Sequence, residues 1–442
     1  MHIAVFSVRF NDIIIDLLLV AYYATRFCIY IISYSEKIVK GKSPQYEFIL
    51  NKVGYFMKIN NEDKIMKNYF DIYSSNTLAG SGNQFIFTSN GNEVKTGRIF
   101  YKIYCGGRYN YSFLFSNVTD STFADGKISA KNHICPEWTI HRLRAGRLRF
   151  FPEGITYEQM AAAGGICNDI GDVKDVTFCG EKEKKVAKGE IFYSDPVEME
   201  FCKGEYLCVE ITFSGTEIPC HEESLLPTFI RNGEFWEYSH GVPVPSMVGC
   251  DRNIKGRIAF LGDSITQGIG TPLNSYRHWN ALFAEKLGQD FSYWNLGLGF
   301  GRAEDAASGG VWLKKAKNSD FCFVCFGVND LLQGRRKEAI MRDLRHIYKE
   351  LTASGAKVIM QTIPPFDYPE ELRKVWSDIN DFIKNDPTFG EVFDVVPFLR
   401  ESEEKPFNAR FGGHPNEKGC KIWAERLYYK LKDKFRKWRT LL

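Results

Sequence analysis

The stretch GRIAFLGDSITQGIG, residues 256–270, decides the fold of the second half of the chain. Within it, RIAFL (residues 257–261) is almost entirely apolar and predicts a buried strand that ends at a glycine. Asp263 and Ser264 follow, at the point where a strand gives way to a helix. Two roles are open for Ser264: a nucleophile at the end of a buried strand, or part of a helix cap.

Downstream of this stretch, short apolar strands alternate with helices. The segments FSYWNL, FCFVCFG, KVIMQT and EVFDVV predict strands, and helices are expected over residues 275–288, 337–355 and 416–435. This alternation predicts a parallel sheet with helices on both faces. Functional side chains are then expected beyond the carboxyl ends of the strands.

Upstream, the pattern is different. Residues 57–250 contain short aromatic and β-branched runs, such as NQFIFTS, GRIFYKIYC and YLCVEITFSG, separated by Gly, Asn, Asp and Ser. This spacing predicts a jelly-roll-like β-sandwich, interrupted by one helical patch over residues 156–165. The expected organisation is therefore a mainly-β sandwich domain (57–250) followed by an α/β domain (251–442).

For residues 1–56 the sequence predicts a leader or a hydrophobic segment. Residues 13–32 are long enough to span a bilayer, but Asp16 and Arg26 lie within them, and charges are costly at membrane depth. A membrane anchor and a segment outside the working fold both stay open. The expected location is cytoplasmic, and the alternative is a membrane-anchored or secreted protein.

Composition narrows the function classes. The net charge of the 442 residues is +3, which gives no electrostatic case for nucleic acid. The basic run HRLRAGRLR, residues 141–149, alternates with apolar residues and predicts a solvated strand face. The 12 cysteines lack zinc-type paired spacing, and Cys322 and Cys325 lie in a predicted buried strand. No cofactor or metal is expected.

Four polar clusters fall at strand ends or before the last helix: residues 262–264, 295–302, 327–330 and 412–419. Each alone is typical of a turn or cap. Together they supply what serine-based ester cleavage needs. A serine requires a base, for which histidine is suited near neutral pH, and the oxyanion requires fixed N–H donors.

These clusters resemble the blocks of the SGNH (GDSL-type) hydrolase superfamily: GDSIT, NLGLGFG, GVND and HPN, over residues 257–442. The resemblance implies a flavodoxin-like three-layer α/β/α domain and ester hydrolysis without metal. It implies Ser264 as nucleophile and His414 as general base and then acid. The oxyanion donors would be Ser264, Asn329 and a residue of the glycine loop.

Two positions depart from the family pattern. The family usually carries an aspartate three residues before the histidine, and here Phe411 stands there. A Ser–His dyad, with a backbone carbonyl holding the imidazole, is one outcome, and a decayed enzyme is another. In the second block, Phe300 falls where glycine is expected, and we favour the neighbouring Gly301 as the donor. Asp263 is expected to anchor the loop and not to be the triad acid.

The β-sandwich before an SGNH domain resembles the bacterial carbohydrate esterases of family 2. This implies removal of short acyl groups, above all acetyl, from a saccharide. A lipase- or lysophospholipase-like esterase and an inactive glycan-binding protein are the alternatives. Trp279, Trp294 and Trp312 are expected in the core, with sugar stacking as the alternative. The segment 218–229 is expected either over the site or between the domains.

Overall fold

The structure is a computed structural model that describes residues 63–80, 85–122, 130–220 and 225–441. The predicted leader segment, including residues 13–32, lies outside the described residues. Residues 62–442 belong to one compact unit. None of the helices in the described part of the chain combines the length and the apolar character that crossing a bilayer requires.

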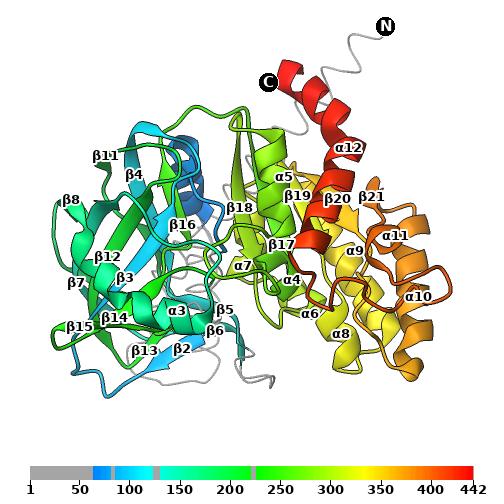
Figure 1. Cartoon of the computed structure of the whole chain (residues 1–442), viewed down its shortest axis with the longest axis horizontal. Helices are drawn as coiled ribbons and strands as arrows, with labels where there is room; N and C mark the ends of the chain where they lie inside the picture. Colours follow the sequence, from blue (N-terminus) through cyan, green and yellow to red (C-terminus); the bar gives the residue numbers. More distant parts are fainter. Residues whose placement is uncertain (1–62, 81–84, 123–129, 221–224, 442) are drawn as a thin grey trace, which may run out of the picture. The chain divides into compact units, whose positions relative to one another are not determined.

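The first half of this unit is built from antiparallel sheets, as predicted (Figure 1). One sheet contains β1 (Ser74–Ser75), β16 (Met247–Cys250), β4 (Gly107–Ser116), β10 (Ile191–Tyr193) and β11 (Val197–Phe201). The other contains β15 (Phe235–Tyr238), β14 (Thr228–Asn232), β3 (Lys95–Lys102), β12 (Tyr206–Gly215), β7 (Trp138–Leu148), β8 (Gly171–Val176) and β9 (Lys184–Val186). Two hairpin-like pairs join β2 (Phe85–Thr88) with β13 (Glu217–Cys220), and β5 (Val118–Thr122) with β6 (Ala130–Ile134).

A single apolar core joins the two larger sheets of the β domain. Phe113 and Phe115 of β4 pack in one cluster with Ile99 and Tyr101 of β3 and with Val209 of β12. Alternate residues of β11 are buried, which is the pattern of a strand with one face on a core. The sandwich prediction is therefore confirmed.

The helical patch predicted at 156–165 is shorter than expected. Helix α3 (Tyr157–Ala162) begins at a capping box made by Thr156 and Gln159, and the chain then tightens into the 3₁₀ helix η1 (Ala163–Asp169). Residues 63–72 form a helix that the β-rich pattern of this region does not predict.

The second half contains a five-stranded parallel sheet in the order β18-β17-β19-β20-β21. The strands are β17 (Gly256–Gly262), β18 (Phe291–Gly297), β19 (Phe321–Cys325), β20 (Lys357–Gln361) and β21 (Glu391–Phe393). This is the flavodoxin-like order, in which the chain leaves β17 for one neighbour and returns on its other side. The predicted α/β/α class is confirmed.

The helices take their places from this strand order. Right-handed crossovers in opposite directions along the sheet put α5 (Trp279–Leu287) on one face, and α7 (Val311–Ala316), α9 (Lys337–Ala353) and α10 (Glu370–Asn385) on the other. The last helix, α12 (Glu417–Leu441), returns to pack on α5 (Figure 1). There Trp279 and Trp423 stack with ring centroids 4.8 Å apart.

Polar contacts join the β-rich half to the parallel sheet. The buried Lys315 of α7 pairs with the buried Asp120 of β5 at 2.7 Å. The Trp294 indole N–H of β18 donates to the Ser246 carbonyl at 2.9 Å. Removing one partner of a buried ion pair is costly, so these contacts hold the two halves in one unit.

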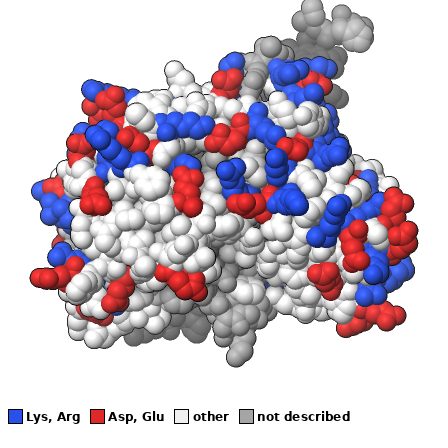
Figure 2. All heavy atoms as spheres, in the orientation of Figure 1, with Lys and Arg blue, Asp and Glu red and all other residues white. Residues whose placement is uncertain are grey.

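Charged side chains of both signs are mixed over the face drawn in Figure 2. The basic run of β7 is likewise paired with acidic side chains. Arg142 pairs with Asp175 at 2.8 Å, and Arg147 pairs with Glu205 at 3.1 Å. The run therefore lies on a strand face whose arginines form ion pairs, which agrees with the predicted solvated strand face.

Candidate active site

Ser264 lies where β17 turns into the one-turn helix α4 (Ser264–Gln267). Asp263 is the N-cap, and its carboxylate accepts a hydrogen bond from the N–H of Ile265 at 3.0 Å. Gly262 allows the tight turn, because a Cβ there would lie 2.2 Å from the Thr266 hydroxyl oxygen. The cap is therefore made by Asp263, which leaves the Ser264 hydroxyl available for another partner.

Side chains behind α4 fix its carboxyl end. Asn280 donates to the Thr266 carbonyl at 2.6 Å, and Asn295 donates to the Gln267 carbonyl at 3.2 Å. These bonds satisfy two of the carbonyls that a helix end leaves without an intrahelical partner. The first turn after β17 is therefore held rigidly at the switch point of the sheet.

His414 precedes α12, and it meets Ser264. The Ser264 hydroxyl oxygen and His414 Nε2 are 2.7 Å apart, across 150 positions of sequence. The loop is held close to α4 because Gly270, with φ of 97°, packs against the His414 backbone, where a Cβ would lie 2.7 Å from its carbonyl oxygen. The structure thus brings together the two side chains that the sequence singled out.

The surroundings of the His414 ring are mostly apolar. Its ring meets the Phe366 ring edge-on, with centroids 5.4 Å apart, and its pKa is lowered by burial. Phe411, at the position where an acid is usual, packs against the apolar core. Within the described residues, Nδ1 of His414 has no hydrogen-bond partner. The described residues therefore supply a Ser–His pair without a third member.

This environment predicts the pH dependence of ester cleavage. Only the neutral imidazole can accept a proton, and burial disfavours the cation. We expect kcat/KM for p-nitrophenyl acetate to rise with pH with a midpoint below 6.5 and to be flat from pH 7 to 8. A midpoint well above 6.5 that persists in Asp263→Asn would instead reveal an anionic partner of the imidazolium. His346→Ala, on the exposed face of α9, is the control and leaves the midpoint unchanged.

The glycine loop after β18 forms a turn. The Gly301 N–H donates to the Leu298 carbonyl at 3.0 Å, and Phe300 occupies the left-handed region with φ of 56°. Glycine is favoured in that conformation, so Phe300 occupies a glycine-like position, at the place where the family pattern has glycine. Gly301 was predicted to donate its N–H to the oxyanion. In the structure this N–H instead donates to the Leu298 carbonyl within the turn.

Asn329 follows β19, at the start of α8 (Val328–Leu332). Its side-chain amide donates one hydrogen to the Gly301 carbonyl at 3.1 Å. An amide nitrogen carries two hydrogens, so this bond orients the group and leaves its second hydrogen for another acceptor. Gly301 is therefore tied to Asn329 through its carbonyl oxygen.

A buried charge network next to these loops is absent from the sequence interpretation. Asp330 accepts from the Ala303 N–H at 2.9 Å and pairs with Arg335, which also pairs with Asp343 at 2.7 Å. Arg302, at the end of the glycine loop, pairs with Asp305 at 2.6 Å. Asp330 is thereby committed to positioning the loops. In the sequence, Asp330 lies five residues before Arg335, and Arg302 ends the glycine loop. This arrangement of acidic and basic residues could have indicated the network.

Asp263 is buried, and burial, with a smaller contribution from the nearby Asp330, raises its pKa to about 7. The Asp263 carboxyl loses its proton near pH 4 in the unfolded chain and near pH 7 in the folded chain. Its contribution to the free energy of unfolding is therefore fully present below pH 4 and is lost as the pH rises to 7. We expect Asp263→Asn to raise the free energy of unfolding by about 1–3 kcal/mol at pH 8 and to change it little at pH 4. Urea unfolding at both pH values measures this, and an equal difference at both would contradict it.

The structure also places the other candidates that the sequence offered. Trp279, Trp294 and Trp312 are all buried, which confirms the core alternative. Of the segment 218–229, residues 221–224 lie outside the described residues, and residues 218–220 belong to β13. In the described part of the chain, no group of three His, Cys, Asp or Glu side chains is arranged to hold a metal ion.

Comparison with known proteins gives one family. Residues 260–422 match the model of the GDSL-like Lipase/Acylhydrolase family. No curated protein is detectably similar to the chain in sequence.

Several solved structures are similar to parts of the chain. A family two carbohydrate esterase from Clostridium thermocellum is 13% identical, with 83% of this chain and 99% of that chain covered and a TM-score of 0.35. The psychrotrophic esterase EstA from Pseudoalteromonas sp. is 18% identical, with 41% and 98% covered and a TM-score of 0.33. The aryl esterase of M. smegmatis is 18% identical, with 40% and 98% covered and a TM-score of 0.31.

The matched residues begin within β17, before Ser264, and run beyond His414 into α12, so they include the paired serine and histidine described above. Residues 260–422 therefore form a GDSL-like lipase/acylhydrolase domain, and the chain is an ester-cleaving hydrolase.

Proposed function

We propose that this hydrolase removes short acyl groups, above all acetyl, from carbohydrate, with Ser264 as nucleophile and His414 as its base. The observation that carries the proposal is the 2.7 Å contact between the Ser264 hydroxyl and His414 Nε2. A hydroxyl becomes a competent nucleophile when a neutral imidazole within hydrogen-bond reach takes its proton.

The reaction follows from these atoms. His414 Nε2 takes the proton as the Ser264 oxygen forms a bond to the ester carbonyl carbon, and the carbonyl oxygen becomes an oxyanion. When the C–O bond to the sugar breaks, the imidazolium gives its proton to the departing alkoxide. Water, deprotonated by the same ring, then releases the acyl group as a carboxylic acid and restores the Ser264 hydroxyl.

Two donors are proposed for the oxyanion. The Ser264 N–H is the first of α4 and belongs to the backbone donors that a helix start leaves without an intrahelical partner. The second hydrogen of the Asn329 amide is the other, held in place by the bond to Gly301. Fixed donors of this kind stabilise the charge that develops in the transition state.

Asn329→Ala tests the second donor. Loss of one oxyanion donor costs about 10²–10³-fold in kcat, and we expect a decrease of this size with little change in KM. The measurement is steady-state hydrolysis of p-nitrophenyl acetate. Asn318→Ala, which removes an amide bonded to the Lys314 carbonyl elsewhere in the domain, is the control. A decrease below 10-fold would remove Asn329 from the proposed hole.

The His414 dyad is proposed to work without a carboxylate. Phe366 and burial give the ring an apolar setting that keeps it neutral, while the loop packing around Gly270 holds its orientation. A decayed hydrolase that only binds glycan is the second candidate, favoured by the missing acid at Phe411. The short Ser264–His414 contact supports the active enzyme instead.

Acyl length and the sugar are tested separately. We expect p-nitrophenyl acetate to be cleaved with a kcat/KM at least 10-fold higher than that of the octanoate. A preference for octanoate would favour the lipase-like alternative. We expect acetate release from acetylated xylan or acetylated glucomannan, abolished in Ser264→Ala. Cleavage of the aryl acetate without release from any acetylated saccharide would keep the esterase and overturn the carbohydrate substrate.

A further inference from the structure

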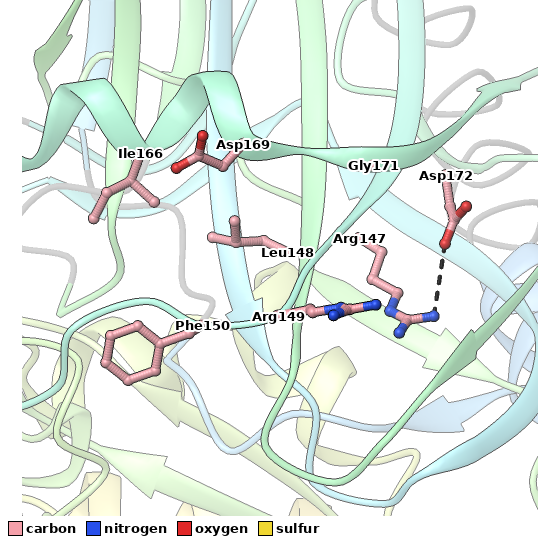
Figure 3. A pocket seen from close by; sticks show the side chains of 8 residues that line it. All are labelled: Arg147, Leu148, Arg149, Phe150, Ile166, Asp169, Gly171 and Asp172. Atoms are coloured by element: carbon pink, nitrogen blue, oxygen red, sulfur yellow. Dashed lines mark ion pairs between the residues drawn. The ribbon is translucent and has the colours of Figure 1, made fainter.

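We propose that the β domain carries a second binding site, for a neutral oligosaccharide, in the hollow between the end of β7 and the η1–β8 connection (Figure 3). The hollow has a volume of about 590 Å³, within the range of small-ligand sites. Its lining consists of Arg147, Leu148, Arg149, Phe150, Ile166, Asp169, Gly171 and Asp172. None of these residues belongs to the hydrolase domain.

The hollow exists because two strands stop pairing regularly. The β7–β8 register shifts between Ala145, which pairs with Lys174, and Arg147, which pairs with Gly171. Such an irregularity bends the strands and opens the ladder locally. At Gly171, an added Cβ would meet nothing within 4 Å and φ is not in the left-handed region, so this position faces open space. The opening is therefore built into the backbone.

One side of the hollow is apolar. Phe150 is 69% exposed and contacts no other aromatic ring among the residues that the structure describes, and Ile166 and Leu148 also line the hollow (Figure 3). A pyranose presents C–H groups on its faces, and an exposed aromatic ring offers a flat apolar surface for them. Phe150 is therefore placed to stack on a sugar ring.

The other side carries charges of both signs, some paired and some not. Arg147 is held by Glu205 at 3.1 Å and by Asp172 at 3.6 Å. Arg149 and Asp169 are both exposed, and neither has a hydrogen-bond or ion-pair partner among the residues that the structure describes. One unpaired donor group and one unpaired acceptor group thus line the same opening.

This combination selects the ligand class. An anion would gain from Arg149 but be repelled by Asp169, and a cation would meet the reverse. Sugar hydroxyls both donate and accept, so a neutral glycan can satisfy both side chains at once. A second hollow of about 440 Å³ shares Arg147 and Asp172 with the first, so the two hollows are neighbours. An elongated, uncharged saccharide fits these features.

The hollow would bind the polysaccharide at a second site, separate from Ser264, and its role in the reaction rests on the proposed function. The test measures binding in the Ser264→Ala protein, so that no acyl chemistry interferes. Isothermal titration uses cellohexaose, xylohexaose, mannohexaose and, as an acidic probe, hexagalacturonate. We expect at least one neutral hexasaccharide to bind more tightly than hexagalacturonate.

Two variants close the site in different ways. Phe150→Ala removes the stacking surface, and Gly171→Trp fills the open space; each is expected to weaken binding of that hexasaccharide at least 10-fold. Phe235→Ala is the matched control, because Phe235 is 76% exposed on β15 of the same domain and lies outside the hollow. It leaves binding unchanged.

The readouts separate this site from the catalytic one. In the otherwise wild-type protein, Phe150→Ala and Gly171→Trp are expected to keep the rate on p-nitrophenyl acetate within 2-fold. Retained binding in both variants, binding of hexagalacturonate alone, or no binding of any probe would overturn the second site. Absence of acetate release from acetylated polysaccharide, with hexasaccharide binding intact, would instead overturn only the proposed substrate.

Discussion

Ser264→Ala is expected to lower kcat for p-nitrophenyl acetate by about 10⁴-fold or more. The hydroxyl is the atom proposed to form the acyl-enzyme, and in the structure it contacts His414 and not the backbone of its own helix. Because Asp263 caps α4, removal of the Ser264 hydroxyl leaves that cap in place. Activity is therefore lost while stability is kept. Steady-state hydrolysis and thermal unfolding, measured on the same preparation, separate the two.

The control for this variant is Ser319→Ala. Ser319 is also a buried serine of the hydrolase domain, and its hydroxyl donates to the Ala316 carbonyl. We expect it to retain activity within a few-fold of wild type. If Ser264→Ala kept a tenth or more of the wild-type rate, another residue would have to be the nucleophile.

His414→Ala is expected to lower kcat by about 10⁴-fold or more, as in other hydrolases where the serine and its base act as a unit. The double variant with Ser264→Ala should be no slower than either single variant, because each removes the same step. A multiplicative loss in the double variant would contradict a shared role.

A histidine in a packed loop can also be structural, so this variant needs a chemical rescue. The alanine leaves space beside Ser264, and added imidazole is expected to restore part of the rate in His414→Ala but not in Ser264→Ala. His346→Ala is the control and should match wild type. Loss of the fold in His414→Ala, seen as a lower unfolding temperature, would assign the histidine a structural role.

Much of the fold could be predicted because it depends on local pattern. The five strands of the parallel sheet are short apolar runs, and each predicted run contains the observed strand or coincides with most of it. Ser264 and His414 could be singled out because GDSIT, after a strand, and HPN, before the last helix, resemble blocks of the SGNH superfamily. The strand order then places them at one edge of the sheet.

The misses have particular physical causes. The helix predicted from residue 275 begins at Trp279, because Tyr276 has φ of 54° and His278 is the N-cap. Helix α10 was not predicted, although Trp376, Ile379 and Ile383 mark its buried side at helical spacing. The partner of the Gly301 N–H is a turn carbonyl, and a motif cannot show which way a backbone N–H points.

The charge network around Asp330 could not be predicted for a different reason. It joins residues from the glycine loop, α8 and α9, which come together only when β18 and β19 lie on either side of β17. Pairings of this kind depend on tertiary placement. The domain limits and the catalytic roles of individual residues stay predictions.

Covalent labelling with a fluorophosphonate, followed by intact mass and peptide mapping, tests whether the Ser264–His414 pair is a working nucleophile and base. We expect one phosphonyl group per chain, carried by Ser264. Labelling should be lost in Ser264→Ala and slowed at least 100-fold in His414→Ala. A wild-type protein that stays unlabelled while hydrolysing p-nitrophenyl acetate, or a label on any other serine, would contradict the proposed mechanism.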